Sequence, residues 1–408
     1  MKIATILFTY NRSNHTKRTL EALYKNKKLP EKLFIFQDGP KDKNDLGEWH
    51  KVNNIIKNVN WCKCSVIVSD INKGLKNSIL YGVNYVFNFF DAVIVLEDDC
   101  VAHPLFITYM YNALSKYCDN QQVYSISGSN VPSDFNENGT DAFFSGRIES
   151  WGWGTWKNRW KKMKEDYGIL ARIKKDEETY KRFRIWGSDF ESYLLGNIEG
   201  TCNSWATFWG MTVIENNGVC LQPYKSLIDQ IGVDGTGTHS GVGELKQRLR
   251  DIEDLNEIVL PDKIEITKDT EERYQEYYYW TAPEKRRGVY NDVLLEWIEM
   301  KRRGKSIKKY LDLMNKDVIS IYGKGSLCDL LINEIENKKR ISSVIVTNPL
   351  QSFYNDLPLV DIENMPVKTN LIVVIPIYDY EIIKRKIKRV TTCEVMGIDQ
   401  LIEEASNI

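Results

Sequence analysis

The sequence predicts an α/β protein whose first part is a doubly wound sheet and whose last part is a second, smaller α/β domain. Apolar stretches typical of strands alternate with amphipathic stretches typical of helices from residue 1 to about residue 118. The same alternation starts again near residue 317, after a charged and increasingly helical stretch. Strands that alternate with helices favour parallel strands with helices packed on both faces of the sheet.

The elements of the first part follow from apolar periodicity and from the residues that end each run. Strands are expected at 3–9, 33–36, 65–68, 93–96 and 219–223. Helices are expected at 13–25, 45–59 and from about 72 to 86. Because the carboxyl ends of parallel strands share one edge, the residues after each strand are expected to converge there.

Composition describes an ordinary globular protein. The chain has 408 residues, of which 42% are hydrophobic and 27% charged, so two or three domains are expected. Lys and Arg number 55 against 56 Asp and Glu, which gives no indication of a nucleic-acid partner. Basic stretches at 157–164 and 301–309 suit either solvated helix faces or contact with an anionic donor or membrane surface.

The sequence favours a cytoplasmic protein. The apolar start of the chain is too short for a signal peptide, and no run is long enough to span a bilayer. The eight cysteines are therefore expected to be reduced thiols.

Three acidic residues follow the apolar run 93–96. Glu97, Asp98 and Asp99 stand where this buried strand should leave the sheet, and adjacent carboxylates repel one another. A divalent cation bound through oxygen ligands would remove that repulsion. The alternative is an acidic strand-to-loop turn without a ligand.

Other residues at the same predicted edge suit a sugar nucleotide. Asp38 follows the second strand and can accept hydrogen bonds from a base or ribose. The turn with Thr9, Tyr10 and Arg12 can face the nucleotide, with Arg12 near a phosphate. In the segment 72–74, the Lys73 side chain supplies a positive charge, and Gly74 lets a ligand approach the backbone closely.

These segments, in this order and spacing, resemble glycosyltransferases of the GT-A fold, most closely the family 2-like bacterial enzymes. The acidic motif Glu97-Asp98-Asp99 also resembles that of the N-acetylglucosaminyltransferase of complex N-glycan synthesis. The resemblance covers about residues 1–245 and implies a Rossmann-like, doubly wound mixed sheet. It implies that Asp99 binds Mn²⁺ or Mg²⁺ and that Glu97 and Asp98 face the ribose or water. The implied donor is a nucleotide sugar, with a UDP-sugar expected.

A segment rich in tryptophan and glycine begins near residue 150. In it, Trp151, Gly152 and Trp153 suit contact with the donor sugar or the acceptor, because indoles stack on sugar rings. Similar Gly-Trp segments occur in the family 2-like enzymes. The alternative is a turn that packs in the core.

The resemblance also implies a catalytic base and a second metal ligand. Inverting transfer needs a carboxylate that takes the proton of the acceptor hydroxyl. The GT-A pattern places this carboxylate at a helix start, where Asp189 is the first candidate and Glu191 the second. A late histidine completes the metal shell in many GT-A enzymes, and His239 in the glycine-rich stretch 232–240 resembles it. His103 is a rival that also suits a simple loop contact.

The expected domains are a catalytic domain at 1–250, a helical extension at 251–316 and a small Rossmann-like domain at 317–408. The aromatic run 274–280 is interpreted as packing, with contact to a lipid-linked acceptor at a membrane as the alternative. In the last domain Cys328 replaces the third glycine of the dinucleotide fingerprint, which disfavours NAD and favours a binding or homo-oligomer module.

The leading hypothesis is a metal-dependent, inverting glycosyltransferase that acts in bacterial surface polysaccharide or glycan synthesis. A glycan, lipid-linked or protein-linked hydroxyl is the expected acceptor. A nucleotidyltransferase that makes a sugar nucleotide is the first alternative, although the first turn lacks a glycine-rich, basic loop for a triphosphate. A non-catalytic carbohydrate-binding protein is the second.

Overall fold

The computed structural model describes residues 1–130, 139–200, 202–232, 234, 249–279, 283–346, 352–362, 369–377 and 380–408. The chain divides into two compact units, Met1–Thr281 and Ala282–Ile408. The stretch 251–316, for which we expected a separate extension, is therefore divided between the two units.

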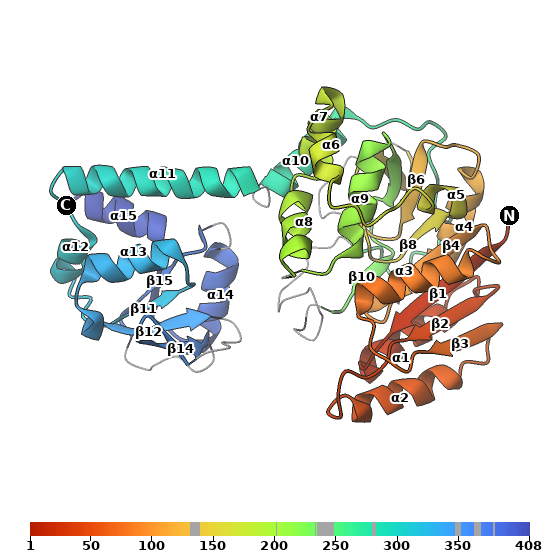
Figure 1. Cartoon of the computed structure of the whole chain (residues 1–408), viewed down its shortest axis with the longest axis horizontal. Coiled ribbons are helices and arrows are strands. Elements are labelled where there is room, and N and C mark those ends of the chain that lie inside the picture. Colours follow the sequence, from red (N-terminus) through yellow and green to blue (C-terminus); the bar gives the residue numbers. More distant parts are fainter. Residues whose placement is uncertain are drawn as a thin grey trace. The chain divides into compact units, whose positions relative to one another are not determined.

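The first unit is built on an eight-stranded mixed sheet (Figure 1) with the order β3-β2-β1-β4-β8-β6-β9-β7. Strands β3, β2, β1 and β4 run parallel, whereas β8 is antiparallel to both β4 and β6. Beyond it, β9 is parallel to β6 and antiparallel to β7. The predicted doubly wound mixed sheet is confirmed. The strand bounds are β1 (Ile3–Thr9), β2 (Leu33–Gln37), β3 (Cys64–Val68), β4 (Ala92–Glu97), β6 (Val123–Ser127), β7 (Ala142–Ser145), β8 (Trp153–Trp156) and β9 (Val219–Pro223).

Helices cover both faces of this sheet. The three helices expected early in the chain appear as α1, α2 and α3, with ends close to those predicted. The helix bounds are α1 (Ser13–Tyr24), α2 (Leu46–Lys57), α3 (Leu75–Val86), α4 (Phe106–Lys116), α5 (Lys157–Trp160), α6 (Ile169–Ile173), α7 (Glu177–Trp186), α8 (Phe190–Glu199), α9 (Trp205–Glu215) and α10 (Lys268–Tyr279).

The central strands are buried on both faces because their side chains alternate between two apolar cores. Val93 and Val95 of β4 pack in the core that includes α3 and α9. Ile94 and Leu96 pack in the core that includes α1, α2 and α4. This double burial explains why the run 93–96 is apolar throughout.

The tryptophan-rich segment forms a central strand rather than the loop or turn that its composition suggested. Strand β8 lies between β4 and β6, and its side chains are buried. At Gly154 a Cβ atom would lie 2.8 Å from both Met110 Cε and the Val93 carbonyl oxygen. Glycine is present because the neighbours approach so closely, as is common for glycine inside a strand.

A small two-stranded sheet adjoins the acidic residues. Strand β5 (Cys100–Ala102) starts directly after them and pairs antiparallel with β10 (Ile228–Gln230). This pairing brings the segment after β10 back to the carboxyl end of β4.

The second unit contains a six-stranded sheet with the order β13-β14-β12-β11-β15-β16. All its neighbouring strands are parallel except the β13–β14 pair. Two helices precede the first strand of this sheet, and the chain turns between them near Gly304, which has a φ of +73°. The bounds are α11 (Pro283–Arg302), α12 (Ile307–Leu313), β11 (Ile319–Tyr322), α13 (Ser326–Ile335), η1 (Lys338–Arg340), β12 (Ile341–Val346), β13 (Phe353–Tyr354), β14 (Leu357–Asp361), β15 (Leu371–Val374), α14 (Tyr380–Val390), β16 (Glu394–Gly397) and α15 (Ile398–Ser406).

In the described parts of both units, no helix is long and apolar enough to cross a bilayer. All eight cysteines are described, and all are free thiols.

Candidate active site

The carboxyl ends of β1, β2 and β4 meet at one edge of the large sheet. Strand β1 pairs with β2 at Thr9 and Gln37, and with β4 at Phe8 and Glu97. The turn after β1, Asp38 after β2 and the acidic residues after β4 therefore leave the sheet beside one another. This is the edge where open α/β sheets bind ligands.

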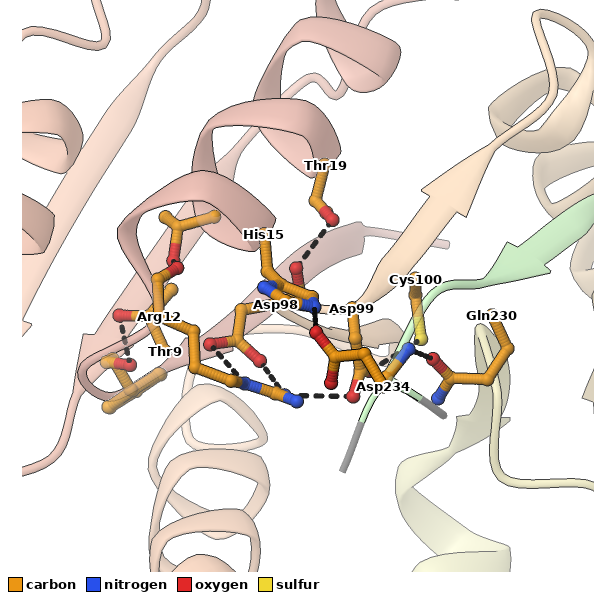
Figure 2. A network of polar contacts seen from close by, with 12 residues as sticks. Thr9, Arg12, His15, Thr19, Asp98, Asp99, Cys100, Gln230 and Asp234 are labelled. Carbon is orange, nitrogen blue, oxygen red and sulfur yellow. Dashed lines mark hydrogen bonds and ion pairs between the residues drawn. The ribbon is translucent and has the colours of Figure 1, made fainter. Parts of the chain in front are cut away.

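The guanidinium group of Arg12 lies against two of the acidic side chains (Figure 2). Its Nε donates to Asp98 Oδ2 at 3.3 Å, and its Nη2 donates both to Asp98 Oδ1 and, at 2.8 Å, to Asp99 Oδ2. We predicted that Arg12 faces a phosphate, whereas here it is the counter-charge of buried carboxylates. Its Nη1 is buried and has no hydrogen-bond partner among the described residues.

Glu97 and Asp98 resist ionisation. Burial, followed by the neighbouring charges of Asp99 and Asp98, raises the pKa of Glu97 to about 8. Burial also raises the pKa of Asp98 to about 6, although the charge and hydrogen bond of Arg12 act in the opposite direction. A cation bound beside them would favour the ionised forms.

The segment after β10 approaches Asp99 closely. The Ile231 N–H donates to the Asp99 carbonyl oxygen at 3.0 Å. At Gly232 a Cβ atom would lie only 2.2 Å from Asp99 Oδ2, so a larger residue fits only if the Asp99 side chain or the backbone at residue 232 moves. The predicted metal ligand His239 lies outside the described residues.

Two residues of this network are not among those predicted from the sequence. His15 Nε2 lies 3.2 Å from Oδ2 of Asp234, which belongs to the glycine-rich stretch (Figure 2). On the same helix, the Thr19 hydroxyl donates to the Asp98 carbonyl oxygen at 2.7 Å. The spacing of Arg12, His15 and Thr19 places them on one helix face, and this periodicity is the signal that could have identified His15.

Asp38 joins the loop after β2 to the loop before α3. Its carboxylate accepts hydrogen bonds from the N–H groups of Gly39 at 3.0 Å, Lys73 at 2.9 Å and Gly74 at 2.9 Å. The Lys73 N–H also reaches the second carboxylate oxygen at 3.1 Å, so each oxygen of Asp38 accepts two of these hydrogen bonds. Gly74 has a φ of +75°, which favours glycine, and the Lys73 ammonium lies 4.1 Å from the centre of the Tyr81 ring.

Thr9 and Tyr10 shape the turn after β1. The Thr9 hydroxyl donates to the Phe36 carbonyl oxygen at 3.4 Å, and the Tyr10 hydroxyl donates to Asp45. Burial and the hydrogen bond to Asp45 raise the pKa of Tyr10 to about 12. These contacts hold the turn against the loop that follows Asp38.

The tryptophan-rich segment divides between the site edge and the core. Because β8 is antiparallel to β4, its first residue, Trp153, pairs with Val95 near the carboxyl end of β4, and Trp151 precedes β8 by two residues. Gly152 has a φ of +64°, and a Cβ there would lie 2.6 Å from Ile228. Trp153 is buried and stacks on Trp205 with ring centres 4.8 Å apart. For Gly152 and Trp153 the structure favours the packing alternative, whereas half-buried Trp151 stays at the site edge.

The two candidate bases have different partners. Asp189 is buried, and its two carboxylate oxygens accept hydrogen bonds from Arg147 at 2.6 and 2.9 Å. Glu191 forms an ion pair with Lys174 at 2.9 Å. As expected for positions two apart near a helix start, their side chains point in different directions.

The rival histidine, His103, has a structural role. Its ring contacts the Asp251 carbonyl oxygen at 2.9 Å and accepts the Leu105 N–H at 3.2 Å. Burial lowers its pKa. These contacts support the loop interpretation of His103.

A family model described as Glycosyl transferase family 2 matches residues 5–178. The matched range contains the turn after β1, Asp38, Gly74 and all three acidic residues. Residues 5–178 form a glycosyl transferase family 2 domain. The predicted resemblance to family 2 glycosyltransferases and the predicted enzyme class, a glycosyltransferase, are confirmed. The resemblance of the Glu-Asp-Asp motif to the N-acetylglucosaminyltransferase of complex N-glycan synthesis stays a prediction.

Three solved structures are among those similar to the chain. A mannosyltransferase, PcManGT from Pyrobaculum calidifontis in complex with GDP-Man and Mn²⁺, is 10% identical with a TM-score of 0.34, covering 52% of this chain and 68% of its own. S. aureus TarS 1-349 in complex with UDP-GlcNAc is 12% identical with a TM-score of 0.33, and the match covers 56% of this chain and 58% of the TarS chain. A cytidylyltransferase from Leptospira borgpetersenii is 13% identical with a TM-score of 0.23, and the match covers 31% of this chain and 53% of the cytidylyltransferase chain. No curated protein sequence matches the chain.

The acidic residues offer carboxylate oxygens, which are the ligands that Mg²⁺ and Mn²⁺ prefer. Burial and then the neighbouring charges of Asp99 and Asp98 raise the pKa of Glu97. Among the described residues, no three His, Cys, Asp or Glu side chains are arranged to hold a metal ion. Asp99 would therefore need partners from elsewhere, and His239 is the predicted one.

Proposed function

We propose that this glycosyltransferase transfers a sugar from a nucleotide-sugar donor, with a UDP-sugar expected, to a hydroxyl group of an acceptor. The transfer depends on a divalent cation and inverts the anomeric centre. The observation that carries the proposal is the meeting of Asp38, Arg12 and the three acidic residues at one sheet edge. Together they offer acceptor groups for a nucleoside and charge for a diphosphate.

The donor is held by the loops that Asp38 connects. The Asp38 carboxylate is the proposed acceptor for a base N–H or a ribose hydroxyl, and Gly74 lets the donor approach the backbone. The turn Thr9–Arg12 and the Lys73 ammonium lie where they can approach the diphosphate. Trp151, which precedes β8, is proposed to contact the donor sugar.

Asp99 and His239 would hold Mn²⁺ or Mg²⁺, with Glu97 and Asp98 facing the ribose or water. When bound, the cation offsets the charge that develops on the departing diphosphate. The contact of Arg12 with both Asp98 and Asp99 supports a site for positive charge at this point of the sheet edge.

Asp189 is the proposed base, with Glu191 as the second candidate. The acceptor oxygen forms a bond to the anomeric carbon while the bond from that carbon to the diphosphate oxygen breaks. The diphosphate leaves with the electron pair, and the hydroxyl proton passes to the carboxylate. In the structure both oxygens of Asp189 accept hydrogen bonds from Arg147, so the proposal requires that one of these bonds opens before the carboxylate takes the proton.

We place the enzyme in bacterial surface polysaccharide or glycan synthesis, on the cytoplasmic side and in peripheral contact with the membrane where the acceptor is lipid-linked. The residues 317–408 are proposed to bind a partner or a second copy of the chain. A hexose or an N-acetylhexosamine is the proposed transferred sugar.

The test is a panel of UDP- and GDP-hexoses and N-acetylhexosamines incubated with the full chain and Mn²⁺. Release of nucleoside diphosphate, and a thermal shift with the donor that turns over, are expected. If no donor is turned over and none shifts the melting temperature, the proposed function is contradicted.

A further inference from the structure

The side chain of Arg12 occupies the position where a positive charge is needed. It contacts both oxygens of Asp98 and one oxygen of Asp99, so it satisfies two carboxylates at once (Figure 2). Only 16% of the Arg12 side chain is exposed, and the two carboxylates are more deeply buried. A guanidinium in this position compensates buried anions in the same way as a bound cation.

One oxygen atom shows why Arg12 and a cation exclude each other. Asp99 Oδ2 accepts the Arg12 hydrogen bond at 2.8 Å, and it would lie 2.2 Å from a Cβ atom at Gly232. This oxygen therefore lies between a guanidinium and the backbone of Gly232. A cation at this oxygen competes with Arg12, because two positive charges on one carboxylate oxygen repel each other.

The geometry allows Arg12 to move without unfolding the turn. Its backbone is fixed, since its carbonyl oxygen accepts the Thr16 hydroxyl at 2.9 Å and the Thr16 N–H at 3.0 Å. Its side chain is held only by the carboxylates among the described residues, and Nη1 has no partner there. Arg12 also directly precedes α1, and a helix N-terminus favours phosphate groups.

We propose that Arg12 is an internal counter-ion that competes with the divalent cation for Asp98 and Asp99 and that passes to the donor diphosphate when cation and donor bind together. This inference rests on the proposed function, because it assumes a cation at Asp99. Its consequence is thermodynamic coupling: the cation alone binds weakly, and the diphosphate strengthens cation binding by giving Arg12 a new anionic partner.

The test measures Mn²⁺ binding by calorimetry, with and without UDP, in the wild-type chain and in Arg12→Gln. The glutamine variant should bind Mn²⁺ alone about 10-fold more tightly than wild type, and UDP should strengthen its Mn²⁺ binding less. In thermal melts without UDP, Mn²⁺ should raise the melting temperature of Arg12→Gln more than that of wild type.

Arg18→Gln is the matched control, because it removes the same charge from an exposed position on the same helix. It should bind Mn²⁺ like wild type. Arg12→Lys is a second test that does not depend on the folding of the glutamine variant. It keeps the charge but loses the two-point contact with Asp98, so its Mn²⁺ affinity should exceed that of wild type by a smaller factor than in Arg12→Gln.

The outcomes separate the two proposals. A wild-type chain that binds no Mn²⁺ even with UDP contradicts the proposed function. A wild-type chain that binds Mn²⁺ with UDP, together with Arg12 variants that bind Mn²⁺ no more tightly than wild type, overturns the role of Arg12 alone.

Discussion

Glu97 illustrates at the scale of one residue how the fold prepares a site at the expense of stability. Burial beside Asp99 and Asp98 raises its pKa to about 8 from an ordinary value of 4.5. The folded chain therefore binds a proton at Glu97 over a pH range in which the unfolded chain does not. By linkage, the free energy of unfolding falls as pH rises from about 4.5 to about 8.

Glu97→Gln should remove this pH dependence. At pH ~8 and without a divalent cation, we expect the variant to be more stable than wild type by on the order of 2 kcal/mol. At pH ~5 the difference should be small, because Glu97 is then protonated in the folded chain. Urea denaturation at the two pH values measures this, and an equal difference at both would contradict the assignment.

Gly232→Ala tests the close approach to Asp99. The added methyl group would meet Asp99 Oδ2 at 2.2 Å, so we expect loss of about 1–3 kcal/mol in the free energy of unfolding and weaker Mn²⁺ binding. Gly47→Ala is the control, since nothing lies within 4 Å of a Cβ there. Unchanged stability and Mn²⁺ affinity in Gly232→Ala would show that the segment after β10 does not constrain Asp99.

At the scale of elements, the sequence alone was sufficient to find β1, β4, β9 and the first three helices, because their apolar periodicity is uninterrupted. It was not sufficient to find β8. Glycine and tryptophan are typical of turns and binding loops, and the reason for Gly154 is contact with Met110 and Val93, which are distant in sequence. Strand identity here depends on tertiary packing.

The same limit applies to side-chain partners. The convergence of Asp38 and Glu97 at one edge follows from parallel strands and could be predicted. The contacts of Arg12 with Asp98, of His15 with Asp234 and of Arg147 with Asp189 join residues far apart in the chain. Short-range periodicity contains no signal for such pairs.

The start of α8 supplies the test of the base. Asp189→Asn keeps the shape of the side chain but removes its ability to take a proton, so turnover should fall by about 10² to 10⁴-fold with little change in donor binding. Glu191→Gln should change turnover by less than about 10-fold, because Glu191 faces Lys174. Turnover and donor affinity are measured together with a thermal melt of each variant.

Normal turnover in Asp189→Asn would exclude Asp189 as the base. A large loss of turnover in Glu191→Gln, with no loss in Asp189→Asn, would identify Glu191 as the base.

At the scale of the whole molecule, the chain combines a glycosyl transferase family 2 domain with a separate α/β unit. The second unit has five parallel strands in the order β14-β12-β11-β15-β16, which is the order of the first five strands of a Rossmann sheet. Its presence was predictable because strand and helix alternation resumes after residue 317. The role of this unit was not predictable, because fold alone does not determine function.

The central claim is that Asp99 holds the cation on which sugar transfer depends. The most direct measurement is Mn²⁺-dependent release of nucleoside diphosphate by the full chain and by Asp99→Asn, with Asp91→Asn as the control at the opposite end of the same strand, where Asp91 accepts the Lys2 N–H at 2.7 Å. We predict that Asp99→Asn lowers turnover by about 10²-fold or more while Asp91→Asn retains it. Full Mn²⁺-dependent turnover in Asp99→Asn would contradict the account.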